Sequence, residues 1–152
     1  RPELSDLEAG VIRGGYCLEA AVGEGPRINL LGSGTILFEV IEAASRLRQE
    51  GFAVAVYSIT SYIELARDAE RASYSNETSW LSHLFSEPGV PTIAASDYVR
   101  TLPRMIASWV PGPMVALGTD GFGMSERREA LRAHFRIDAQ AIAEAARSLV
   151  NA

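Results

Sequence analysis

The sequence predicts a three-layer α/β domain, in which an open and mostly parallel sheet of about five strands carries helices on both faces. Short apolar runs alternate along the chain with segments in which apolar residues recur every three or four positions. One of these runs, Ala53–Ile59, is almost wholly apolar, which is typical of a strand covered on both faces. The length of 152 residues, of which 47% are hydrophobic and 22% charged, suits a single domain spanning residues 1–152.

The first half of the chain predicts strands and helices in alternation. Apolar residues alternate with other residues within Arg13–Ala21, a pattern typical of a half-exposed strand at a sheet edge. Ser61 and Glu64 have the spacing of a capping box, in which the two side chains accept backbone N–H groups at a helix start. The elements expected after the first strand are a strand at Ile28–Leu31, a helix from Ile36 to near Gly51, a strand at Ala53–Ile59 and a helix from Ser61 to about Arg71.

The second half begins with a polar segment, Ala72–Gly89, which we interpret as a loop with a short helix. Apolar residues between Tyr98 and Val110 then recur at helical spacing, although Pro103 implies that the regular part of this helix begins close to Leu102. The other elements expected here are strands at Pro91–Ala95 and Met114–Leu117, a helix opened by Ser125 or Glu126, and a last helix capped by Asp138.

Composition excludes several functional classes. All 14 basic side chains are arginine, so mechanisms that need a lysine are ruled out, among them phosphate loops of the Walker type and Schiff-base chemistry. A net charge of −5 gives no attraction for nucleic acid or anionic lipid, and no apolar stretch is long enough to cross a membrane. Cys17 is the only cysteine, which excludes an intrachain disulfide and favours a reducing, cytoplasmic setting. Since the chain does not begin with Met, we expect a piece of a longer protein.

Polar residues follow each of the four expected parallel strands: Ser33, Thr60 and Ser61, Ser96 and Asp97, and Thr119 and Asp120. In an open α/β sheet this edge is where ligands bind. The same residue types are preferred at helix N-caps, so capping and a ligand crevice both account for them.

The turn Gly32–Gly34 is similar to the opening of a dinucleotide-binding fingerprint. Leu37 stands where the third glycine of that fingerprint should be, and no acidic residue ends the second parallel strand. The alternatives are a small-ligand or nucleotide site and a tight turn with Ser33 as N-cap.

The segment Gly118–Gly123 has three glycines around a Thr-Asp pair and Phe122, so its backbone must turn sharply. We interpret it as a loop that docks against another domain or subunit in the intact protein, with Asp120 accepting backbone amides or meeting an arginine from another surface; a catalytic Asp120 is the alternative. His83 and His134 lack the spacing of a helical metal pair, and His134 fits a helix terminus. The charges of Glu126–Arg136 fit a solvated helix face.

Several segments together resemble the C-terminal domain of the homodimeric pyruvate dehydrogenase E1 family. The resemblance runs in order along nearly the whole chain but is not recognisable in Ala72–Gly89. It is most specific at Gly118–Gly123, followed by Leu131-Arg132 and His134-Phe135. The other segments are Leu31–Gly34 with Ile36-Leu37, Val56–Ser61, Glu64–Asp68, Ala95–Tyr98, Trp109–Pro111, Arg128 and Asp138.

The resemblance implies a transketolase-type C-terminal domain, with a five-stranded mixed sheet whose first strand runs against the others. It also implies a parent enzyme that uses thiamine diphosphate and magnesium to decarboxylate pyruvate and passes the acetyl unit to the lipoyl group of the E2 component. In that family the cofactor lies between the N-terminal and middle domains of two subunits, while the C-terminal domain serves assembly. We therefore assign no catalytic, cofactor-binding or metal-binding residue to this chain, and expect it to be inactive alone.

The expected partners are the N-terminal and middle domains, a second E1 subunit and, through the parent, the E2 acetyltransferase. Two alternatives stay open. The parent can be a paralogous E1 that acts on another 2-oxo acid, or the chain can be an independent small-ligand or nucleotide-binding α/β domain.

Overall fold

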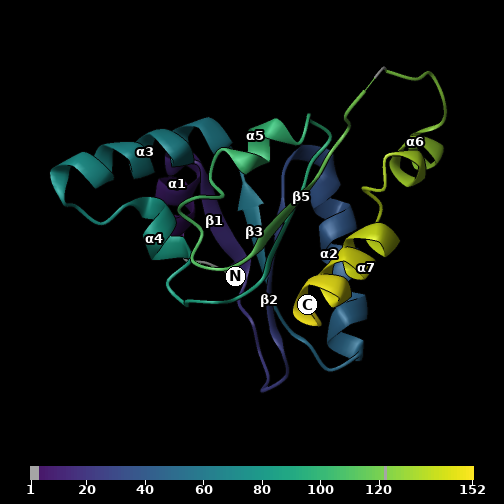
Figure 1. The fold of residues 1–152 in the computed structure, drawn as a ribbon, viewed down its shortest axis with the longest axis horizontal. Helices are drawn as coiled ribbons and strands as arrows, with labels where there is room; N and C mark the ends of the chain where they lie inside the picture. Colours follow the sequence, from purple (N-terminus) through teal and green to yellow (C-terminus); the bar gives the residue numbers. More distant parts are fainter. Residues whose placement is uncertain (1–3, 122) are drawn as a thin grey trace.

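A five-stranded sheet lies at the centre of the computed structural model, which describes residues 4–121 and 123–152 (Figure 1). The strands lie in the order β1-β3-β2-β4-β5, and β1 pairs antiparallel with β3 at one edge, whereas the other pairs are parallel. Their bounds are β1 Gly15–Glu19, β2 Arg27–Gly32, β3 Ala53–Ile59, β4 Thr92–Ala95 and β5 Met114–Leu117. The predicted mixed sheet with its antiparallel edge strand is therefore confirmed.

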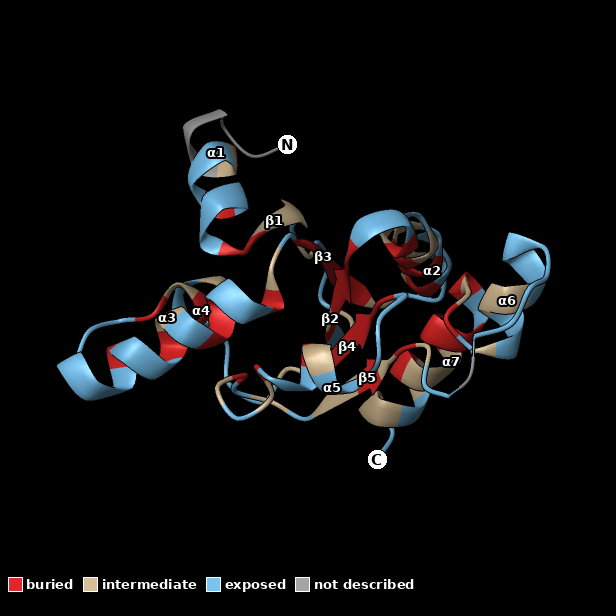
Figure 2. Ribbon diagram, turned by 90° about the horizontal axis from the view of Figure 1, so that it is seen from above, coloured by how far each residue is buried: buried red, intermediate tan, exposed pale blue. Residues whose placement is uncertain are grey.

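Helices cover both faces of the sheet (Figure 2). Successive residues of β2 point to opposite faces, so Leu30 packs with helices α2 (Leu37–Gln49) and α7 (Ala139–Val150). Leu31 belongs to the core on the other face, which α3 (Tyr62–Ser75), α4 (Trp80–Leu84) and the segment that includes α5 (Thr101–Arg104) cover. Because both faces are buried, all seven residues of β3 are buried.

Two of the predicted helix caps form, and one of these lacks the reciprocal hydrogen bond of a capping box. The side chain of Asp138 accepts the Ala141 N–H at 2.9 Å and starts α7 as expected. Ser61 Oγ likewise accepts the Glu64 N–H at 3.2 Å at the start of α3. The reciprocal bond is absent from these residues, because the Glu64 carboxylate binds Arg67 and the Ser61 N–H donates to the Gly14 carbonyl.

The N-terminal part differs from the prediction. A helix, α1 (Leu4–Arg13), precedes the first strand, which starts at Gly15 rather than Arg13. Gly14 ends this helix with a φ of +104°, a conformation that glycine adopts without the steric cost of a side chain. The end of α1 meets the end of β3, where Thr60 Oγ1 donates to the Val11 carbonyl at 2.8 Å.

The helix expected between Tyr98 and Val110 is also wrong in extent. Only α5 forms there, and the chain continues through turns in which the N–H groups of Ala107 and Trp109 bond carbonyls three residues earlier. The spacing nevertheless predicted burial correctly, since Ile106 and Val110 are buried.

Smaller differences concern the polar segment and the last helices. Helix α3 runs on to Ser75 and α4 follows, with Ser79 as its cap. Helix α6 (Arg128–His134) begins later than the expected Ser125 or Glu126. Among the described residues, no helix is both long and apolar enough to cross a membrane.

Candidate functional site at the carboxyl edge of the sheet

The chain leaves β2 toward β3 on one side and later crosses back to β4 on the other side. The topological switch point therefore lies between β2 and β4, and ligands of open α/β sheets bind outside the carboxyl ends of such strands. In Figure 1 this carboxyl edge faces upward, and Figure 2 looks down on it. The predicted polar strand ends gather here: Ser33, Thr60, Ser61, Ser96, Asp97, Thr119 and Asp120.

Most of these side chains serve the backbone of the domain. Besides the Ser61 cap and the Thr60 bond to α1, Thr119 Oγ1 donates to the Asp97 carbonyl at 2.9 Å. Ser96 Oγ accepts the Tyr98 N–H at 3.4 Å. Of these four residues only Ser61 caps a helix as the capping interpretation predicted, whereas Thr60, Thr119 and Ser96 bond backbone groups outside helix starts.

Ser33 is the exception, and its predicted capping role is wrong. It stands at the N-cap position of the short 3₁₀ turn Gly34–Ile36, but its side chain makes no capping hydrogen bond. Its Oγ and the hydroxyl of Tyr62 are both buried, and neither has a hydrogen-bond partner among the described residues. Both residues line a cavity of about 130 Å³ that Ile63 and Tyr98 also line, and burial raises the pKa of Tyr62.

The glycine turn brings a strand and a helix into close contact. A side-chain Cβ at Gly32 would lie 2.8 Å from the Leu37 Cα and 3.0 Å from Val40 Cγ2. The backbone of α2 therefore fills the space beside Gly32, and Gly34 adopts a φ of +54°. This geometry favours the tight turn over a nucleotide site.

Asp120 joins the segment that follows β5 to the segment that follows β4. Its Oδ1 accepts the Arg100 backbone N–H at 2.8 Å, and its Oδ2 accepts Arg100 Nε at 2.6 Å. These hydrogen bonds hold the pKa of Asp120 below its usual range. The Thr119 N–H also donates to the Tyr98 carbonyl at 2.8 Å. These bonds hold the described part of the loop on a segment of this same chain, and its contact with another domain or subunit stays a prediction. Phe122, expected to pin the turn, lies outside the described residues.

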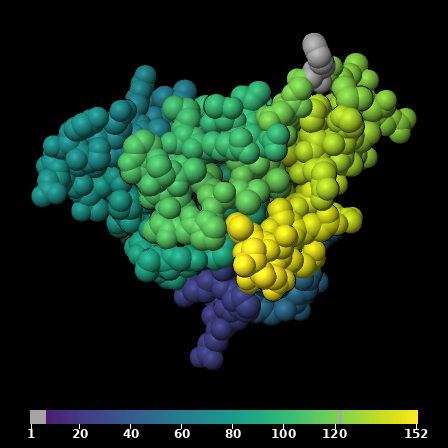
Figure 3. Space-filling model, in the orientation of Figure 1, coloured from purple at the N-terminus to yellow at the C-terminus, as the bar shows by residue number. Residues whose placement is uncertain are grey.

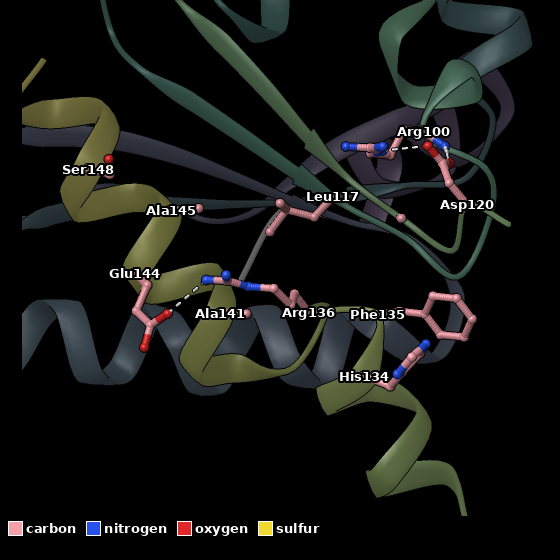
Figure 4. A pocket seen from close by; sticks show the side chains of 11 residues that line it. Arg100, Leu117, Asp120, His134, Phe135, Arg136, Ala141, Glu144, Ala145 and Ser148 are labelled. Atoms are coloured by element: carbon pink, nitrogen blue, oxygen red, sulfur yellow. Dashed lines mark hydrogen bonds and ion pairs between the residues drawn. The ribbon is translucent and has the colours of Figure 1, made fainter. Parts of the chain in front are cut away.

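A cleft of about 620 Å³ opens beside this loop (Figure 4). It lies where the segment around Arg100 and Gly118 meets α7, the green and yellow surfaces in Figure 3. Its charged groups are Arg100 and Asp120, bonded to each other, and Arg136 and Glu144, which pair at 3.1 Å. His134 lies at the rim, edge-on to Phe135. Since these carboxylates are engaged by arginines, the cleft offers no free acid–base pair.

The two histidines lie in different parts of the structure. His83, in the last turn of α4, stacks on Trp80 with ring centroids 4.8 Å apart, and Arg13 lies over the same indole at 4.5 Å. Trp80 Nε1 donates to the Gly15 carbonyl at 2.8 Å. His83 and Trp80 thus help to anchor α4 on the end of α1, whereas His134 ends α6 as predicted.

Sequence reasoning missed the ion pairs between residues far apart in the chain, among them the pair that Glu39 makes. Glu39 Oε1 binds Arg132 at 2.8 Å, and Glu39 Oε2 accepts the Ala139 N–H at 2.9 Å, so α2 holds α6 and the start of α7. The expectation of a solvated helix face is wrong at Arg132, whose side chain is only 15% exposed. No local sequence pattern predicts a pair whose members are 93 residues apart in the chain.

The fold and this edge define an α/β domain of the doubly wound type with one antiparallel strand. Comparison with known proteins extends this: the family model of the transketolase-like TK C-terminal domain matches residues 14–138. The chain belongs to that family.

Its similarity to relatives is high across the domain. It is 38% identical over 151 residues to the pyruvate dehydrogenase E1 component of Escherichia coli (strain K12), covering 91% of this chain and 17% of that protein. With the same component of Cupriavidus necator the identity is 41% over 150 residues, covering 90% of this chain and 17% of that protein. The chain thus spans about a sixth of the length of these relatives.

Solved structures agree on the fold. Transketolase from Leishmania mexicana superposes with a TM-score of 0.67 at 23% identity, over 94% of this chain and 19% of that one. A split-gene transketolase described as an inactive β4 tetramer gives a TM-score of 0.60 at 20% identity, over 90% of this chain and 42% of that one.

Proposed function

We propose that this chain is the C-terminal domain of a pyruvate dehydrogenase E1 component, in which it serves fold integrity and subunit assembly. The observation that carries the proposal is the identity of 38–41% over about nine tenths of the chain with E1 components of several bacteria. The parent enzyme decarboxylates pyruvate and transfers the acetyl unit to the lipoyl group of E2.

The side chains of this domain do not fit the cofactor of that reaction. Thiamine diphosphate is bound through a magnesium ion, and magnesium prefers carboxylate and carbonyl oxygens. Within residues 4–121 and 123–152 no three His, Cys, Asp or Glu side chains converge in a way that could hold a metal ion. The carboxylate of Asp120 at the carboxyl edge is bonded to Arg100. We therefore assign cofactor binding to other domains of the parent and no reaction step to this one.

The proposed partners follow from this assignment. They are the N-terminal and middle domains of the same polypeptide, a second E1 subunit, and E2 through the parent. The single half-buried cysteine, Cys17, supports a cytoplasmic setting for the parent.

The proposal is tested by measuring the release of carbon dioxide from pyruvate with thiamine diphosphate and magnesium present. The longer protein is expected to turn over, and the 152-residue chain alone is expected to give no release above a control without protein. Turnover by the 152-residue chain alone would overturn the proposal. If the longer protein prefers 2-oxoglutarate or a branched 2-oxo acid to pyruvate, the parent belongs to a paralogous E1.

A further inference from the structure

The exposed apolar side chains of this domain are unevenly distributed. Ten large hydrophobic residues are exposed among the described residues, and six of them lie at the carboxyl edge, where β2, β3 and β4 end. We call these six residues the carboxyl-edge face: Val11, Ile12, Phe38, Ile63, Tyr98 and Val99. They come from four separate segments: the end of α1, the first turns of α2 and α3, and the loop after β4. Apolar residues scattered singly need no explanation, but the location of six of the ten at one edge makes this edge the candidate interaction surface.

Exposure at this face is large. Phe38, in the first turn of α2, is 74% exposed, and Val99, in the loop after β4, is 55% exposed. Several ionic groups nearby pair within the domain, Arg100 with Asp120 and Arg67 with Glu64, whereas the Asp97 carboxylate beside Tyr98 is exposed. A mainly apolar face of this kind suits a protein surface that is also apolar.

The path of the chain indicates what covers this face. Helix α1 ends at the carboxyl edge, where the Gly14 carbonyl accepts the N–H groups of Thr60 and Ser61. The chain therefore enters the domain from this side of the sheet. The family is that of a C-terminal domain, and the relatives are about six times as long, so the remainder of such a protein precedes α1.

We propose that the carboxyl-edge face docks on the domain that precedes it in the same polypeptide. This inference rests on the proposed function, because it needs the longer chain. The cavity of about 130 Å³ opens in this face between Ile63, Tyr98 and the buried Ser33 and Tyr62. It has room for one side chain of the preceding domain, and a polar group on that side chain would give the Ser33 and Tyr62 hydroxyls the hydrogen bonds they lack.

The first test measures side-chain accessibility in the longer protein by carbene footprinting. Phe38 and Val99 are expected to be labelled at least about tenfold less than Val22, which is 82% exposed at the opposite edge of the sheet. Equal labelling of Val99 and Val22 would overturn the proposal without any substitution having been made.

The second test compares Val99→Asp with the matched control Val22→Asp in the longer protein. Both valines are exposed in the domain, so neither aspartate disturbs its core. Val99→Asp is expected to speed proteolytic release of the domain by about tenfold, and Val22→Asp to leave it unchanged. Equal rates would contradict the proposal, as would a Val99→Asp protein that changes only its oligomeric state, since the face would then contact another subunit. Loss of turnover on pyruvate would instead bear on the proposed function.

Discussion

Asp120 binds Arg100 through both carboxylate oxygens, one to the backbone N–H at 2.8 Å and one to Nε at 2.6 Å. The segment after β5 is thereby joined to the segment after β4, next to a Gly118 whose Cβ would lie only 2.4 Å from the Tyr98 carbonyl oxygen. Within the domain Asp120 therefore acts as a clamp between these two segments. Its contribution to stability depends on the charge of the carboxylate.

The clamp predicts a pH dependence. The hydrogen bonds from Arg100 lower the pKa of Asp120, so the folded protein binds this proton less readily than the unfolded chain. The stabilisation is therefore present above about pH 3.9, where an unfolded Asp titrates, and is lost as pH falls through the lower folded pKa. Asp120→Asn is expected to lower the melting temperature at pH 6 and to converge with the unsubstituted protein in acid. Glu24→Gln, in an exposed turn, is the control. If the melting temperature of Asp120→Asn stays equally far below that of the unsubstituted protein in acid, the charge of Asp120 is not the cause.

Glu39 is expected to matter more than a surface carboxylate. Glu39→Ala leaves the Arg132 guanidinium, which is largely buried, without its partner and the Ala139 N–H without its acceptor. The expected loss is about 1–3 kcal/mol in the free energy of unfolding, measured by urea denaturation. Glu42→Ala is the matched control, because Glu42 pairs with Arg46 on the exposed surface of the same helix. Its cost should be about 0–0.5 kcal/mol, and equal costs would contradict the role of Glu39.

Tyr57 gives a prediction at alkaline pH. Burial raises the pKa of Tyr57 to about 12, and its hydroxyl donates to the Leu84 carbonyl at 3.2 Å. The unfolded chain loses this proton near pH 10, whereas the folded chain keeps it. Stability therefore falls as pH rises from about 10 to about 12, by about 2 kcal/mol from this residue. Tyr57→Phe is expected to flatten the fall in unfolding free energy over this range; an unchanged slope would count against burial as the cause.

Gly32 is expected to tolerate no side chain. Gly32→Val places Cβ 2.8 Å from the Leu37 backbone, which cannot move without displacing α2 from the sheet. The expected cost is about 3 kcal/mol or more, measured by thermal or urea unfolding without any ligand. Gly123→Val is the control, since a Cβ there meets nothing within 4 Å. Similar stabilities of the two variants would show that the turn does not depend on this close contact.

The sequence by itself determined the elements whose signals are local. The apolar runs of β2 to β5, the helical spacing of α2 and α7 and the caps at Ser61 and Asp138 depend on residues within a few positions of one another. The ordered motifs that continue to Gly118–Gly123 were likewise sufficient to identify the family. Burial of Ile106 and Val110 was readable from spacing, whereas the hydrogen bonding around Pro103 was not.

Only the tertiary structure decided which distant groups meet. Glu39 finds Arg132 because α2 and α7 pack side by side on one face of the sheet, bringing α6 with them, and Asp120 finds Arg100 because β4 and β5 are parallel neighbours. The carboxyl-edge face exists because parallel strands end together, which gathers Phe38, Ile63 and Val99 from separate segments. Such pairings depend on strand order and helix packing, and no residue's immediate neighbours in the chain encode them.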